Sequence, residues 1–537
     1  MAVFSLIAAI LAFALSGVTT AWDHPTCTKE RFQNLTLDNI DIKFLNVTWL
    51  QNVTVDAAAE QVGSKGEGNH TFAYCQVALT YTHPGQSDTV NTYIGLPIKS
   101  SVWNGRFLMD GGGGWRAGDS TEILAPVAAG YASASTDAGH NITTPTVEWG
   151  LFSEGNVNLP ALNDFASVAL DEAATLGKLA VELYYERPAN YSYWNGCSTG
   201  GRQGHMMAQR YPEQFDGIVA GCPAINWHKF IPAELWPAVM AEVLDTRPPA
   251  CVLDAFRDAA IAECDYLDGV PDGIISEPQW CEFDPYLFVG QTVECEDPQG
   301  TIVVNKAMAT LVNAIWNGPT AEDGSFLWYG LTKDTNLTRL LNTTCTTVDD
   351  CTVNPFSIAF DWAQVFLEKT RNFSLSGVTR NDYDKWFRQS VKEYGSVIGT
   401  DDPDLSQFKK AGGKMIAWHG MQDPLIMHDG SVDYYNRVLS QDAKASDFYR
   451  LFLAPGVGHC GNGRGFDPSS KVFDALLKWV EEDEIPETLT GVGQQVGKDK
   501  TREGVLCPYP KALRYAGPKV WKYNGPKLNK ESSYSCQ

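Results

Sequence analysis

Apolar positions in the second quarter of the chain alternate between helical and strand spacing. From Ala161 to Arg187 apolar residues recur at helical intervals, and Pro188 ends the pattern, so we expect an amphipathic helix there. A strand-like run at Tyr191–Trp194 and a glycine-rich turn follow, then a helical segment at Gly204–Arg210 and an apolar strand at Ile218–Ala220. Helix, strand, turn, helix and strand in succession predict a parallel α/β sheet.

The same alternation returns near the C-terminus. Lys414–Trp418 and Phe448–Leu453 have the pattern of buried strands, and Phe473–Val480 resumes helical spacing. The stretch between the two blocks is rich in Trp, Tyr, Pro and Cys and shows no such alternation, which indicates an inserted lid domain. We therefore expect one α/β domain built from residues 22–225 and 406–537, with the lid at residues 226–405.

An apolar run opens the chain. Residues 2–17 have the length of a signal-peptide core and are too short to span a bilayer comfortably. The small residues Thr19, Thr20 and Ala21 that follow suit signal peptidase. The alternative is a buried N-terminal helix, because no positively charged segment precedes the run. We expect a signal peptide at residues 1–21 and a soluble, secreted protein.

Composition and charge exclude several classes of protein. The 537 residues are 44% hydrophobic and 20% charged, as in a folded globular protein. Lys and Arg number 41 against 64 for Asp and Glu, a net charge of −23. Because such a charge repels polyanions, we expect neither a nucleic-acid partner nor a membrane partner. The sequence leaves the oligomeric state open.

Glycosylation motifs and cysteines agree with export. Nine Asn-x-Ser/Thr motifs are candidate glycan sites, at Asn34, Asn46, Asn52, Asn69, Asn141, Asn190, Asn336, Asn342 and Asn372. In an exported protein the 13 cysteines indicate a disulfide framework with at least one cysteine unpaired. Cys222 is the candidate for the free thiol, because Asp216–Cys222 has the pattern of a buried strand and its end.

A nucleophile motif occupies the glycine-rich turn. Residues 196–200 read Gly-Cys-Ser-Thr-Gly, which matches the G-x-S-x-G turn that exposes a serine between a strand and a helix. Ser198 is therefore the candidate nucleophile, and the Thr199 amide at the helix N-terminus is a candidate donor to an oxyanion. The alternative is a glycine-rich turn with an inert serine.

A base and an orienting acid follow in the order that an α/β-hydrolase requires. Asp423 comes just after one predicted strand and His459 just after the next, so the chain order is Ser, Asp, His. His419 lies too close to its strand to act as the base, and His428 follows the acid in a segment without a strand. These residues predict an α/β-hydrolase fold with a large inserted lid and a catalytic triad.

Two further features surround this predicted triad. Cys197 precedes the serine and Cys460 follows the histidine, so a disulfide between them would join the two loops; the alternative is two unrelated cysteines. Upstream, residues 107–118 form a strand that enters a run of four glycines, where such hydrolases place the second oxyanion amide. A phosphate-binding loop is the competing interpretation, but no Gly-Lys-Ser/Thr follows the glycines.

These motifs resemble the tannase and feruloyl esterase family of secreted carboxylic ester hydrolases. The resemblance covers Gly196–Gly204 (GCSTGGRQG), Trp418–Ile426 (WHGMQDPLI) and Gly458–Gly461 (GHCG), within a match from Cys27 to Cys536. It implies Ser198, Asp423 and His459 as the triad, a Cys197–Cys460 bridge, and a lid that supplies much of the substrate specificity. The expected second oxyanion amide is that of Gly113, and Trp115 and Arg116, which depart from the smaller residues of relatives, leave Gly114 open as the alternative.

The lid contains an acidic loop, residues 264–274 (CDYLDGVPDGI). By itself this loop is as compatible with a solvated acidic turn as with a cation site. The resemblance implies a structural Ca²⁺ held by the side chains of Asp265, Asp268 and Asp272 and the carbonyls of Val270 and Ile274. It also implies four further disulfides, Cys264–Cys281, Cys345–Cys351, Cys507–Cys536 and Cys27–Cys75, which leaves Cys251 and Cys295 as a pair by elimination.

The function implied is hydrolysis of phenolic-acid esters through an acyl-serine, with no organic cofactor. The substrate would be a feruloyl or other hydroxycinnamoyl ester, either a small molecule or linked to a polysaccharide. A tannase that acts on galloyl esters is the alternative within the family. A non-catalytic glycoprotein that keeps the hydrolase fold as a binding module is the alternative outside it.

Overall fold

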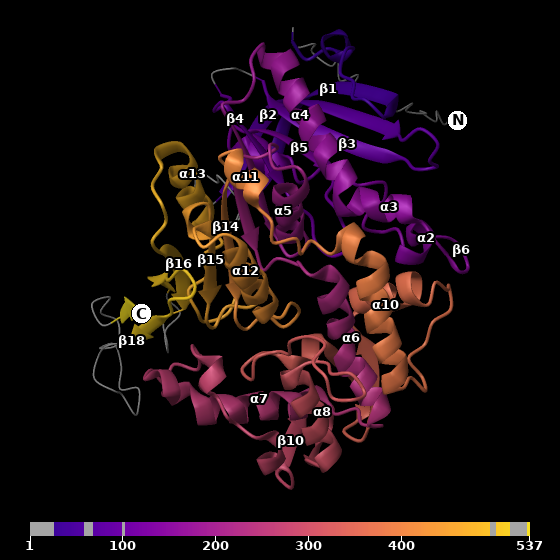
Figure 1. Cartoon of the computed structure of the whole chain (residues 1–537), viewed down its shortest axis with the longest axis vertical. Helices are drawn as coiled ribbons and strands as arrows, with labels where there is room; N and C mark the ends of the chain where they lie inside the picture. The colour runs from indigo at the N-terminus through magenta and orange to yellow at the C-terminus, as the bar shows by residue number, and fades with distance from the viewer. Residues whose placement is uncertain (1–25, 58–67, 99–101, 495–500, 516–533) are drawn as a thin grey trace, which may run out of the picture.

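A nine-stranded mixed β-sheet forms the centre of the computed structural model, which describes residues 26–57, 68–98, 102–494, 501–515 and 534–537 (Figure 1). In sheet order the strands are β1 (Asp41–Ala57), β2 (Gly68–Thr82), β3 (Val90–Pro97), β5 (Ala132–Thr136), β4 (Arg106–Asp110), β8 (Tyr191–Cys197), β9 (Gly217–Gly221), β14 (Lys414–Gly420) and β15 (Tyr449–Ala454). The first four are antiparallel neighbours, and from β5 to β15 all neighbours are parallel. This is the α/β-hydrolase arrangement that the sequence predicts.

Helices pack against the sheet between successive parallel strands, as a βαβ path requires. They are α4 (Ala169–Tyr185), α5 (Thr199–Arg210) and α12 (Asp429–Gln441), and α13 (Val472–Glu482) packs against the sheet after its last strand, β15. Shorter helices are α1 (Leu124–Ala128), α2 (Thr146–Gly150) and α11 (Ser406–Lys410). Because the parallel strands are covered on both faces, residues such as Ile218–Ala220 in β9 are all buried.

The helix expected over residues 161–187 is wrong in one respect, because it is not continuous. It consists of α3 (Leu159–Asn163), a π-helical turn over Asp164–Val168, and α4. The wider turn begins at Asp164, a buried carboxylate 4.0 Å from His83 on the neighbouring hairpin. Apolar spacing alone does not distinguish a π turn from an α turn, since both keep one face of the helix buried.

Residues 226–405 contribute no strand to the central sheet. They form α6 (Trp227–Val243), α7 (Ala250–Cys264), α8 (Lys306–Asn317), α9 (Ser357–Asp361) and α10 (Arg380–Ile398), with the hairpins β10–β11 (Thr292–Glu296, Gln299–Val303) and β12–β13 (Leu341–Thr347, Asp350–Pro355). Figure 1 shows α6 and α10 side by side below the sheet, with α7, α8 and β10 beyond them. Small hairpins elsewhere are β6–β7 (Leu151–Ser153, Asn156–Val157), β16–β17 (Leu489–Gln494, Thr501–Leu506) and β18–β19 (Leu513–Tyr515, Tyr534–Cys536).

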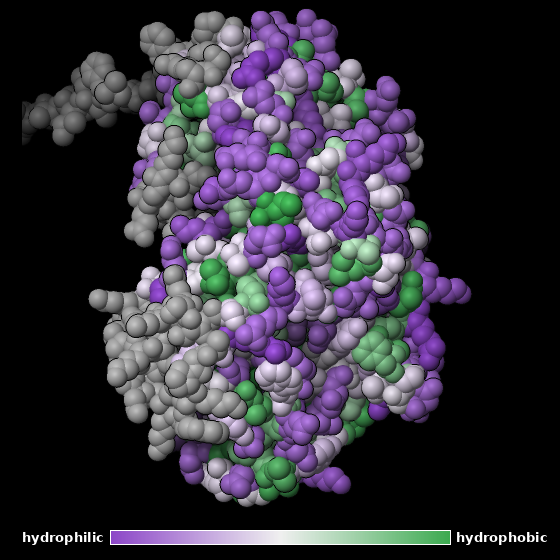
Figure 2. Space-filling model, turned by 60° about the vertical axis from the view of Figure 1, so that its left-hand side comes forward, coloured by the Kyte–Doolittle hydropathy of each residue, from purple (hydrophilic) through white to green (hydrophobic). Residues whose placement is uncertain are grey.

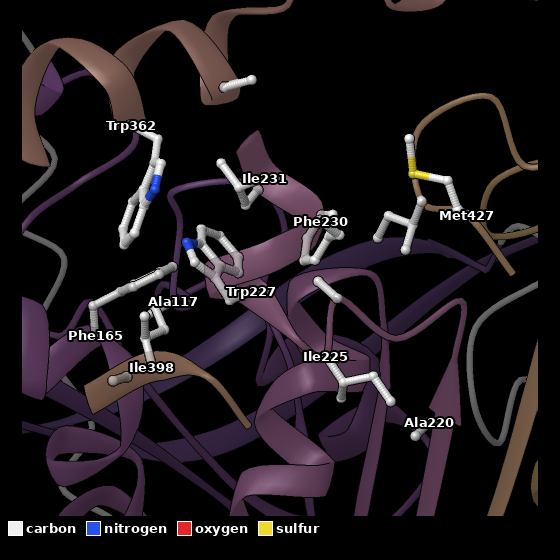
Figure 3. Packing of buried hydrophobic residues seen from close by; sticks show 14 of the residues in the cluster. Ala117, Phe165, Ala220, Ile225, Trp227, Phe230, Ile231, Trp362, Ile398 and Met427 are labelled. Carbon is white, nitrogen blue, oxygen red and sulfur yellow. The ribbon is translucent and has the colours of Figure 1, made fainter. Parts of the chain in front are cut away.

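Buried aromatic side chains join α6 to the sheet domain (Figure 3). The Trp227 ring lies with its centroid 6.0 Å from that of Phe165 and 6.3 Å from that of Trp362. The fully buried guanidinium of Arg202 lies 5.1 Å from the Phe165 ring and donates to two main-chain carbonyls. Since apolar burial and the contacts of the guanidinium with aromatic rings both favour this packing, α6 is anchored to the sheet domain.

Six disulfides cross-link the chain, at Cys27–Cys75, Cys197–Cys460, Cys251–Cys295, Cys264–Cys281, Cys345–Cys351 and Cys507–Cys536. These are the pairs that the sequence and the family resemblance predict. Cys222 is the free cysteine, and it is buried as expected.

The surface carries the nine glycosylation motifs, and the asparagine of each is exposed, as glycan attachment requires. The face in Figure 2 is mostly hydrophilic, with hydrophobic side chains in small scattered groups. Across the described ranges, the helices are too short or too polar to cross a bilayer. The signal peptide predicted at residues 1–21 lies outside the described residues.

Candidate active site

Ser198 stands at the sharp turn between β8 and α5. Its backbone is in a strained conformation, φ 62° and ψ −122°, and its amide donates to the carbonyl of Gly221 on the next strand. A side chain at Gly196 would place its Cβ 2.6 Å from the main chain of Gly200, so the turn requires glycine there. The G-x-S-x-G motif is thus a local backbone requirement, which is why the sequence reveals it.

Asp423 and His459 meet at the ends of β14 and β15. Asp423 Oδ2 lies 2.7 Å from His459 Nδ1, and Asp423 Oδ1 accepts from the amides of Leu425 and Ile426. Burial raises the pKa of Asp423, but the charge of His459 and hydrogen bonds from neighbouring histidines outweigh it, so this pKa lies well below its ordinary value. The carboxylate is therefore ionised and can orient the imidazole of His459.

His459 and Ser198 line the same small pocket. The hydrogen bonds of the described residues do not include one between the Ser198 hydroxyl and His459, and such catalytic contacts often tighten only when substrate binds. The structure thus brings the three predicted triad residues to one place, with the acid and the base already paired.

A second histidine, His419, supports the acid, and no sequence pattern predicts this contact. His419 Nε2 lies 3.2 Å from Asp423 Oδ2, and His419 Nδ1 lies 2.8 Å from the hydroxyl of Ser431. The sequence predicts that the strand ends at Trp418, but β14 continues to Gly420, so His419 lies within the strand and is fully buried. Its contact with the acid depends on the turn after β14, which the sequence pattern does not describe.

Backbone amides beside Ser198 offer an oxyanion site. Thr199 begins α5, so its amide lies at a helix N-terminus, and its hydroxyl donates to the carbonyl of Gly114. The Gly112 amide is already used, because it donates to Gln203. Gly114 lines the Ser198 pocket, whereas Gly113 lines the adjoining cavity with Trp115 and Arg116. Gly114, which lies beside Ser198, is therefore the candidate for the second donor in place of Gly113.

A disulfide fastens the two catalytic loops together. Cys197 and Cys460 are the neighbours of Ser198 and His459 in the chain, and they are bonded across a sequence separation of 263 residues. The buried thiol of Cys222 lies beside this bridge and accepts from the Cys460 amide. Burial and the charge of Asp423 raise the pKa of Cys222 well above its ordinary value, so the thiol stays protonated.

Around the catalytic groups, most of the pocket wall is apolar, and α6 and the α9 region of the inserted segment contribute much of it. Trp227, Phe230 and Ile231 of α6, which lie together in Figure 3, line the pocket. Phe356 and Ile358 contribute from the segment around α9. Leu425 and Ile426, just after Asp423, complete the wall. A planar apolar group is the ligand that such walls accommodate.

The acidic loop faces a different cavity. Asp268, Val270, Asp272 and Ile274 line a cavity of about 330 Å³, whereas Asp265 Oδ1 accepts from three main-chain amides of the loop. Burial raises the pKa of Asp268 to about 6 and that of Asp272 to about 7. The donors are all oxygens, as Ca²⁺ prefers, and a cation would offset the clustered negative charge. Among the described residues, Asp265, Asp268 and Asp272 do not each have a carboxylate oxygen such that all three oxygens lie within 4.8 Å of one another.

Comparisons with known proteins agree with this geometry. The model of the family described as "Tannase and feruloyl esterase" matches residues 75–531. A probable feruloyl esterase of Arthroderma benhamiae is 40% identical over 464 residues, covering 84% of this chain and 85% of the relative. The structure of a tannin acyl hydrolase from Aspergillus niger aligns with a TM-score of 0.82 at 25% identity over 95% of both chains. Feruloyl esterase B from Aspergillus oryzae aligns with a TM-score of 0.77 at 26% identity, over 96% of this chain and 100% of the other. The chain therefore belongs to the tannase and feruloyl esterase family.

Proposed function

We propose that this protein is a serine carboxylic ester hydrolase that cleaves phenolic-acid esters through an acyl-serine intermediate. The observation that carries the proposal is the pairing of Asp423 with His459 at 2.7 Å beside Ser198 on its strained turn, all at one apolar pocket. Family membership adds the reaction class, since the named relatives are feruloyl esterases and tannases.

The mechanism follows from the positions of these groups. His459 accepts the proton of the Ser198 hydroxyl as the serine oxygen attacks the ester carbonyl carbon. The Thr199 and Gly114 amides donate to the resulting oxyanion, and ionised Asp423 stabilises the imidazolium of His459. His459 then protonates the leaving alcohol, which leaves an acyl-serine. Water, deprotonated by His459, releases the acid and restores the Ser198 hydroxyl.

The remaining expectations concern the environment of the enzyme. Six disulfides and nine exposed glycosylation motifs support secretion, because both modifications belong to the export pathway. The acidic loop supports a structural Ca²⁺ held by Asp268 and Asp272 together with Asp265 and the Val270 and Ile274 carbonyls. That ion would stabilise the loop, which the Cys264–Cys281 bridge closes. The triad chemistry itself uses only protein groups.

Hydrolysis of four methyl esters tests the proposal. Methyl ferulate, caffeate, p-coumarate and gallate are compared for wild-type protein and Ser198→Ala. We expect cinnamate turnover that disappears in the variant. A tannase is the second candidate, favoured by the TM-score of 0.82 to the tannin acyl hydrolase, and turnover of gallate alone would identify it. Turnover that persists in Ser198→Ala, or none in the wild type, would refute the assigned chemistry.

A further inference from the structure

A buried carboxyl group lies in the pocket wall without a role in the triad. Glu234 is on α6, and it continues the stripe of Trp227, Phe230 and Ile231 at helical spacing along one face of the helix. All four residues line the pocket that also contains Ser198. The three neighbours are apolar, so an acidic residue at this position breaks the pattern of a purely hydrophobic wall.

The protein does not satisfy this carboxyl group. Glu234 is 2% exposed, and its Oε2 has no hydrogen-bond partner among the described residues. The ion pairs found in the described part of the chain do not include it either. A buried polar atom without a partner destabilises a folded protein, so its retention at a pocket wall requires an explanation. The direct explanation is a ligand that supplies the missing hydrogen-bond partner.

The chemistry of the pocket indicates which ligand group this is. Burial and the charge of Asp423 raise the pKa of Glu234 well above its ordinary value, so the group is a neutral acid. A neutral carboxyl group both donates and accepts a hydrogen bond, which matches a hydroxyl group better than an anion or an amine. The rings of Trp227, Phe230 and Phe356 are among the pocket walls, and such walls suit a flat ring.

We propose that Glu234 is a specificity residue that hydrogen-bonds a ring hydroxyl of the phenolic acyl group while Ser198 attacks its ester carbonyl. This inference rests on the proposed function and narrows it to hydroxylated aromatic acyl groups. A site that pairs a buried group with a substrate hydroxyl discriminates strongly against the analogue that lacks it, because the group is then left without a partner.

Paired esters test the inference. Methyl p-coumarate and methyl cinnamate differ by one ring hydroxyl, and methyl gallate and methyl benzoate form a second, galloyl-type pair. We expect wild-type kcat/KM to favour the hydroxylated member of at least one pair by about 10-fold or more. Glu234→Leu should reduce that preference to about 3-fold or less by losing activity on the hydroxylated ester alone. Glu234→Gln, which keeps a donor and an acceptor, should retain most of it.

The outcomes distinguish failure of the role proposed for Glu234 from failure of the proposed esterase function. If the wild type hydrolyses both members of a pair and Glu234→Leu slows both equally, Glu234 has a structural role and the inference is overturned while the esterase function stands. If the wild type hydrolyses none of the four esters, the proposed function fails and the inference falls with it. A second measurement uses only the wild type, so it does not depend on whether a variant folds. We expect p-coumaric acid to inhibit the wild type at least about 10-fold more strongly than cinnamic acid. Equal inhibition by the two acids overturns the inference.

Discussion

Removal of the Cys197–Cys460 bridge should destabilise the protein more than removal of any short-loop bridge. The bond closes a loop with a sequence separation of 263 residues. Inside this loop the Cys251–Cys295 and Cys345–Cys351 bridges bypass parts of the chain, which shortens the loop to roughly 210 residues in the unfolded chain. Loop-closure entropy for that length corresponds to about 5 kcal/mol at 25 °C, against about 2 kcal/mol for Cys345–Cys351, whose separation is 6. With about 2 cal/mol/K of unfolding entropy per residue, these values correspond to Tm losses of about 5 °C and about 2 °C.

The assay compares two double variants, Cys197→Ala with Cys460→Ala and Cys345→Ala with Cys351→Ala, by calorimetry and by ester hydrolysis. The long-loop variant should also lose about 10- to 100-fold in kcat, because its bridge holds the neighbours of Ser198 and His459 in register. The short-loop variant should keep kcat within about 2-fold. A Tm loss in the short-loop variant equal to or larger than that in the long-loop variant would refute the entropic reasoning. Unchanged kcat in the long-loop variant would refute the positioning role.

Three further perturbations test other parts of the structure. Asp423→Asn should lower kcat by about 10⁴-fold without changing the circular dichroism spectrum, since an amide presents the wrong partner to His459; a loss below about 10-fold would contradict the triad assignment. His83 lies between Asp88 and Glu172. Burial opposes its charge, but the hydrogen bonds with these two carboxylates raise the pKa of His83 to about 9. The stability that charged His83 gives the fold is therefore fully present below pH 6.5 and is lost as the pH rises through 9. Tm should therefore fall over pH 6.5 to 9 less steeply in His83→Gln than in the wild type, and identical profiles would exclude this linkage. Saturating Ca²⁺ should raise the Tm of EGTA-treated wild type by about 2 °C but leave Asp272→Asn unchanged, whereas no shift in the wild type would exclude the calcium site.

The catalytic apparatus was predictable from sequence because its requirements are local. A serine on a strained turn needs glycines such as Gly196 beside it, and an acid and a base at strand ends follow apolar runs that are easy to recognise. The parallel strands were predictable for the same reason, since burial on both faces makes them continuously apolar. The cystine pairs required the family resemblance in addition, because spacing alone permits many connectivities.

Tertiary structure decided the features that depend on contacts between distant segments. The sequence marks Ser198, Asp423 and His459, but only the fold shows that His419 supports the acid and that Gly114 lines the Ser198 pocket instead of Gly113. Glu234 belongs to the same class, since its apolar surroundings come from α6, from the α9 region and from the loop after β14. Local rules govern a turn or a strand, because the interacting groups are neighbours in the chain. The protonation and partners of a buried side chain depend on packing across hundreds of residues, which no local pattern records.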